Sequence, residues 1–117
     1  MQNEPPIIRV EFTDKFKRNL RALAKKYRSI RKDIQPIILQ LEAGELPGDR
    51  IAGIDYAILK VRVTNSDIQK GKSGGYRVIY YIKTTTNIIL VTIYSKLERE
   101  DISTKEIKLI LTEFEQQ

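Results

Sequence analysis

Cysteine and histidine are both absent from this chain of 117 residues. Without cysteine the chain forms no disulfide and has no thiol chemistry, which agrees with the reducing cytoplasm, where we expect the protein. Without histidine it lacks the commonest general acid–base and the commonest metal ligand. We therefore expect no metal site and no small-molecule cofactor. Any catalysis would depend on lysine, arginine, tyrosine, aspartate or glutamate.

Long apolar segments are also missing from the sequence. No apolar run approaches the length needed to cross a bilayer, so we expect no membrane partner. The residues up to Pro6 are too few and too polar for a signal peptide. A length of 117 residues suits one compact domain that covers the whole chain, 1–117.

Positive charge is in excess. Lysine and arginine number 21 against 15 acidic residues, which gives a net charge of +6 and an isoelectric point near 9.6. Such a balance favours a polyanionic partner, either nucleic acid or an acidic protein, although it can also serve solubility alone. The placement of the charges along the chain therefore matters more than their sum.

The spacing of apolar residues predicts an α+β fold. In chain order, the predicted elements are a strand at 7–12, a helix at 14–27, a helix between Ser29 and Gly44, strands at 56–63, 75–83 and 88–94, and a helix after Ser103. This order, β-α-α-β-β-β-α, predicts an antiparallel sheet of about four strands, with any parallel pairing confined to its edge, an N-terminal helical hairpin and a C-terminal helix. Pro36 requires that the second helix either begins near Asp33 or is kinked.

A group of cations lies on and between the first two strands predicted after the helical hairpin. Between positions 60 and 77 there is one acid, Asp67, and the cations are Lys60, Arg62, Lys70, Lys72 and Arg77. Residues two apart on a strand share a sheet face, so this face can present several cations together with the loop lysines. Tyr76, beside them, could stack on a base, as aromatic side chains do in RNA recognition. An RNA phosphate, an acidic partner protein and simple solvation of the lysines are the alternatives.

A second group lies where the last predicted strand leaves the sheet. Tyr94, Lys96 and Glu98 offer a phenol, an ammonium and a carboxylate, which could act as stacking platform, acid and base. Functional groups often lie at such strand ends. Mixed charge in a loop is otherwise ordinary solvated surface.

Three segments together resemble the RelE/ParE superfamily of toxins from type II toxin–antitoxin modules, and most closely its HigB-like RelE branch. They are ILKVR at 58–62, KGKSGGYRVIYY at 70–81 and LVTIYSK at 90–96. The resemblance implies a RelE-like fold of the microbial-ribonuclease type. It also implies a toxin that enters the ribosome, cuts mRNA and is neutralised by a cognate antitoxin.

The resemblance also implies roles for individual residues. Arg77 matches the arginine that faces the scissile phosphate, and Lys70 and Lys72 match the basic loop that grips RNA. Arg62 and Lys96 match basic positions nearby. Cleavage would then be metal-independent, through attack of an RNA 2′-hydroxyl on the adjacent phosphorus.

The chain departs from the RelE pattern at Leu97, where the pattern has a second arginine, and near Ser103, where it has a late tyrosine. The general base therefore stays open: Lys96 or Lys72 could exchange protons, Tyr94 could relay them, and Glu98 could act as the base. Two other functions remain as alternatives. One is inhibition of DNA gyrase without catalysis, as in the ParE branch, and the other is a non-toxic basic module that binds RNA or protein.

Overall fold

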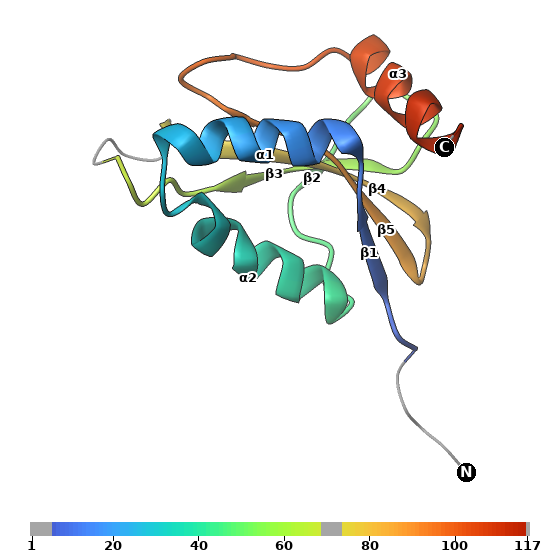
Figure 1. Ribbon diagram of the computed structural model, residues 1–117. Coiled ribbons are helices and arrows are strands. Elements are labelled where there is room, and N and C mark those ends of the chain that lie inside the picture. The colour runs from blue at the N-terminus through green and yellow to red at the C-terminus, as the bar shows by residue number, and fades with distance from the viewer. Residues whose placement is uncertain (1–5, 69–73, 117) are drawn as a thin grey trace.

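The computed structural model describes residues 6–68 and 74–116, in which three helices pack on a five-stranded sheet (Figure 1). The strands are β1 (Arg9–Phe12), β2 (Asp49–Arg50), β3 (Ile58–Val63), β4 (Tyr76–Thr84) and β5 (Asn87–Ser95). The helices are α1 (Asp14–Lys26), α2 (Ile30–Glu42) and α3 (Thr104–Glu115). The predicted α+β fold is confirmed.

The sheet has the strand order β1-β5-β4-β3-β2. The predicted antiparallel pairing is present, since β4 pairs antiparallel with both β5 and β3. β1 pairs parallel to β5, so the sheet is mixed at this edge, as the prediction allowed. The two-residue strand β2 was not predicted, because so short a segment carries no alternation for a sequence pattern to detect.

Helices cover both faces of the sheet and bury two apolar clusters. On one face, α1 and α2 pack against alternate residues of the central strands, among them Val61, Val78 and Tyr80. On the other face, α3 packs against Ile58 and Ile79. Successive strand residues point to opposite faces, so β3 and β4 contribute to both clusters. The helical hairpin and the C-terminal helix therefore lie on opposite sides of the sheet.

Helix α1 protects part of an open strand edge. β1 pairs with the first four residues of β5, so among residues 6–68 and 74–116 the later half of β5 has no strand partner on that side. Two side chains of the α1 region bond there instead: Thr13 Oγ1 donates to Val91 O at 2.6 Å and Asn19 Nδ2 donates to Ile93 O at 3.1 Å. Side chains thus satisfy carbonyls that an exposed edge would leave open to another strand.

The helix ends follow local capping rules with one exception. Thr13 and Ser103 cap α1 and α3, and their hydroxyls accept from the amides of Phe16 and Glu106. Ser29 makes no side-chain cap; its own amide donates to Asp67 Oδ2 at 2.7 Å. A carboxylate from a distant turn therefore takes the place of a local cap.

Helix α2 begins at Ile30 and continues through Pro36, which excludes the first of the two predicted alternatives, a start near Asp33. Proline in a helix interior removes one backbone hydrogen bond. Here Pro36 lies on the exposed side of the helix, where water can satisfy the freed carbonyl.

Candidate active site

Two arginines and a tyrosine form a row across three neighbouring strands. Arg62 of β3 lies directly opposite Arg77 of β4, and Arg77 lies directly opposite Tyr94 of β5. Residues opposite one another in antiparallel strands point to the same face. Lys60, two residues before Arg62, shares this face. The structure therefore brings together four predicted site residues, which we call the cationic row: Lys60, Arg62, Arg77 and Tyr94.

Arg77 occupies an unusual environment for a cation. It is 7% exposed, and its Nη1 donates to the carbonyl of Tyr76 at 3.2 Å. Within residues 6–68 and 74–116, no carboxylate forms an ion pair with it. A buried charge without a partner is unfavourable, and a second arginine, the exposed Arg62, is its cross-strand neighbour. The arrangement favours binding of an anion.

Tyr94 ends the row as a buried phenol. It is 7% exposed, and its hydroxyl donates to Asp101 Oδ1 at 3.4 Å. Burial, reinforced by the negative charge of Asp101, raises the pKa of Tyr94 to about 12, although Arg77 and Arg99 act in the opposite direction. At neutral pH the phenol is therefore protonated, so it can donate a proton or a hydrogen bond but is not itself a base.

Asp101 links the two ends of the row. Its Oδ1 accepts from Lys60 Nζ at 3.3 Å, from the Ile102 amide at 2.8 Å and from the Tyr94 hydroxyl. The hydrogen bond from the Ile102 amide, together with Lys60, lowers the pKa of Asp101. The carboxylate is thus ionised at neutral pH and holds the lysine and the phenol near one another.

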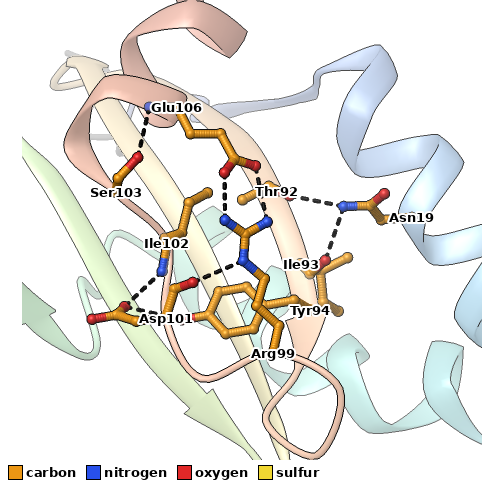
Figure 2. A network of polar contacts seen from close by, with 9 residues as sticks. All are labelled: Asn19, Thr92, Ile93, Tyr94, Arg99, Asp101, Ile102, Ser103 and Glu106. Carbon is orange, nitrogen blue, oxygen red and sulfur yellow. Dashed lines mark hydrogen bonds and ion pairs between the residues drawn. The ribbon is translucent and has the colours of Figure 1, made fainter.

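Arg99 lies next to Tyr94 and was not among the predicted site residues. Its guanidinium carbon is 5.8 Å from the centre of the Tyr94 ring, and its Nε donates to Asp101 O at 2.7 Å (Figure 2). Both terminal nitrogens bond the carboxylate of Glu106 on α3, with Nη1 at 2.9 Å from Oε2. These hydrogen bonds raise the pKa of Arg99 and lower the pKa of Glu106. An arginine five positions after Tyr94 was the signal available in the sequence.

A cavity of about 230 Å³ opens beside Tyr94 at the unpaired edge of β5. Helix α1, the end of β5 and the segment after β5 line it. The predicted base Glu98 lies on this cavity, and its carboxylate pairs with Lys26 of α1 at 3.1 Å. Lys96 lies two residues before Glu98. Its backbone amide donates to Gly75 O at 3.0 Å, and its Nζ donates to the carbonyl of Glu100.

Tyr76 does not lie on the proposed RNA-binding surface, and that prediction is wrong. The residue is fully buried in the cluster beneath α1 and α2, where its ring packs edge-on against Tyr27 at 5.9 Å. It alternates with Arg77 along β4, so it points to the opposite face. The prediction failed because a tyrosine beside an arginine on a strand cannot share its surface. The predicted contacts Lys70 and Lys72 lie outside the described residues.

Residues 6–68 and 74–116 show neither a metal cluster nor a membrane span. No group of three or more acidic side chains among the described residues is arranged to hold a metal ion. None of the helices in those residues is long and apolar enough to cross a membrane.

Comparison with known proteins identifies the family. A family model described as the RelE toxin of the RelE/RelB toxin–antitoxin system matches residues 9–114. No curated protein matches the chain. The match covers nearly the whole chain and implies a cognate antitoxin as partner; assignment to the HigB-like branch stays a prediction. The chain belongs to the RelE toxin family and is a toxin of a toxin–antitoxin module.

Proposed function

We propose that this toxin is an endoribonuclease that cuts mRNA on the ribosome and so inhibits translation. The observation that carries the proposal is the cationic row, in which Arg77 has no carboxylate partner among the described residues and lies between an exposed arginine and a protonated phenol. Such a row offers a phosphate two guanidinium groups and a proton donor side by side. Membership of the RelE toxin family supports the same function.

The proposed reaction is an internal transesterification of RNA. The 2′-oxygen of one nucleotide attacks the adjacent phosphorus while the bond from phosphorus to the 5′-oxygen of the next nucleotide breaks. The 2′-hydroxyl loses its proton to a base, and the departing 5′-oxygen gains one from an acid. The products are a 2′,3′-cyclic phosphate and a 5′-hydroxyl, so the step needs neither a metal nor a cofactor.

Arg77 and Arg62 are the proposed phosphate ligands. A guanidinium stays charged at any physiological pH and can bind two phosphate oxygens at once. Arg62 is exposed and would meet the RNA first, whereas Arg77 lies deeper and would stabilise the charge that develops on the phosphoryl oxygens. Lys60 and Lys96 would hold the flanking backbone, as would Lys70 and Lys72.

Tyr94 is the proposed acid, because its raised pKa keeps the proton on the phenol until the 5′-oxygen departs. Glu98 is the proposed base. It is a carboxylate on the same cavity as Tyr94, and Lys26 of α1 pairs with it at 3.1 Å. Much of the acceleration would come from the ribosome, which positions the mRNA for in-line attack.

Regulated expression in bacteria tests the proposal. We expect the wild type to arrest growth and to create new mRNA 5′ ends inside translated frames, and Arg77→Gln to abolish both. Arg9→Gln is the matched control. Arg9 is an exposed arginine that pairs with Asn87 at the start of β5, whereas Tyr94 lies near the end of that strand. Growth arrest with intact mRNA and lost supercoiling would instead identify a gyrase inhibitor. Accumulation of folded toxin without arrest would identify a non-toxic binding module.

A further inference from the structure

We propose that the cavity beside Tyr94 binds one nucleobase of the RNA substrate and so determines which base stands next to the cleaved bond. This inference rests on the proposed ribonuclease function. It assigns a ligand to the cavity that Tyr94 and the proposed base Glu98 line.

The cavity lies close to the cationic row. Arg62, Arg77 and Tyr94 lie on successive strands, and neighbouring strands are about 4.8 Å apart. The cavity lies immediately beyond Tyr94, where β5 has no strand partner. A nucleotide whose phosphate is held at Arg77 would therefore have its base within reach of the cavity, one or two strand spacings away.

The size and the lining of the cavity suit a single base. Sites for drug-sized ligands measure roughly 300–1,000 Å³, so the volume of about 230 Å³ suits a smaller group such as a single base. The walls are apolar at Ala22, Leu23 and Ile93, and the aromatic residue Tyr94 also lines the cavity. Bases in single-stranded RNA are commonly held against such surfaces.

Asn19 supplies the means of discrimination. Both of its hydrogen bonds among the described residues are donated by Nδ2, to Thr92 Oγ1 at 3.0 Å and to Ile93 O at 3.1 Å (Figure 2). These two bonds fix the amide on the cavity wall and leave its carbonyl oxygen as an acceptor. An acceptor fixed in this way pairs with a donor on the base edge: adenine, cytosine and guanine offer an exocyclic amino group, whereas uracil offers only its ring N3–H.

Two measurements on the full chain test the inference. In the first, backbone amide NMR spectra are recorded during titration with each of the four ribonucleoside 5′-monophosphates and with ribose 5-phosphate, which lacks a base. We expect the nucleotides with amino groups to shift the amides of Ala22 and Ser95, and ribose 5-phosphate to leave them unchanged. Equal shifts with ribose 5-phosphate, or shifts confined to the cationic row, would overturn the inference. This measurement needs no cleavage.

The second measurement uses Ala22→Leu, which fills the cavity and leaves the bonds of Asn19 in place. The control is Lys25→Leu, an exposed position of α1 outside the cavity. When mRNA 5′ ends are mapped, Ala22→Leu should still cleave but with its base preference next to the cut reduced at least several-fold. An unchanged preference would overturn the inference while leaving the ribonuclease intact. Absence of cleavage by the wild type would overturn the proposed function, and the titration would then decide the cavity alone.

Discussion

Arg62 and Arg77 lie directly opposite one another on β3 and β4, so two guanidinium groups share one patch of the sheet. Like charges in this position destabilise a sheet. Lys60 has a carboxylate, Asp101, to offset its charge, but neither arginine forms an ion pair within the described part of the chain. Relief of this repulsion by a phosphate is the physical basis of the proposed function.

Replacing Arg62 should therefore stabilise the toxin while impairing it. Arg62→Thr removes one of the opposed charges at an exposed position and introduces a residue that favours strands. We expect the free energy of unfolding to rise by about 0.2–1 kcal/mol and mRNA cleavage to fall. Urea unfolding and a cleavage assay measure the two effects. A less stable variant with full activity would show that the arginine has a structural role instead.

Tyr94 should make the protein sensitive to alkaline pH. Its folded pKa of about 12 lies above the ordinary value of 10.0, so its stabilising contribution is complete below about pH 10 and is lost as the pH rises towards 12. Tyr94→Phe should therefore lessen the loss of stability between about pH 10 and 12. Thermal unfolding across this range gives the answer, and identical alkaline profiles would count against the assigned pKa.

The same substitution separates the chemical role of Tyr94 from its structural role. Phenylalanine keeps the ring beside Arg99 and loses only the hydroxyl, whose hydrogen bond to Asp101 is long at 3.4 Å. Stability at pH 7 should change little. Removal of a general acid lowers the rate by roughly 10²–10⁴-fold, so cleavage should fall by about that factor. Undiminished cleavage by Tyr94→Phe would exclude the phenol as the proton donor.

Acid should weaken the attachment of α3. The pKa of Glu106 is lowered from 4.5 mainly by its hydrogen bonds to Arg99, so the ion pair stabilises the fold above that pH and is lost as the pH falls through the folded pKa. Glu106→Gln should thus show a smaller decrease in unfolding free energy between about pH 5 and 3 than the wild type. Parallel curves for the two proteins would contradict the assigned role of the pair.

Gly75 should be required for folding. A Cβ atom there would overlap the carbonyl oxygen of Val63 on the neighbouring strand, which cannot move without disturbing β3. Gly75→Ala should lower the unfolding free energy by about 1–3 kcal/mol, as overpacking does. At Gly74 the added atom would meet only the end of the Ile68 side chain, so Gly74→Ala is the milder control. Equal effects of the two changes would disprove the steric explanation.

The fold was predictable because its main elements carry local signals. Segments rich in β-branched and aromatic residues marked β3, β4 and β5, and the hydroxyls of Thr13 and Ser103 marked the starts of α1 and α3. β2 was not predicted, because its pairing with β3 is decided by tertiary contacts. The sequence could not decide the course of α2 at Pro36 for the same reason: packing of Ile34 and Leu41 outweighs the local effect of proline.

The candidate site was only partly predictable. The spacing on β3 placed Lys60 and Arg62 on one face, and the strand register then adds Arg77 and Tyr94. Tyr76 was misassigned because the period of two sends it to the core. Asp101 and Arg99 were missed because a loop has no periodicity from which to infer where its side chains point.

Cleavage of ribosome-bound mRNA by purified protein tests the central claim most directly. Primer extension on programmed ribosomes would compare the wild type, Arg77→Gln, Arg77→Lys and the control Arg9→Gln, each with and without ribosomes. We predict cleavage only with ribosomes, full activity in Arg9→Gln, none in Arg77→Gln, and a much lower rate in Arg77→Lys, which keeps the charge but loses the two-pronged phosphate contact. Undiminished cleavage by folded Arg77→Gln, or no cleavage by the wild type, would contradict the account.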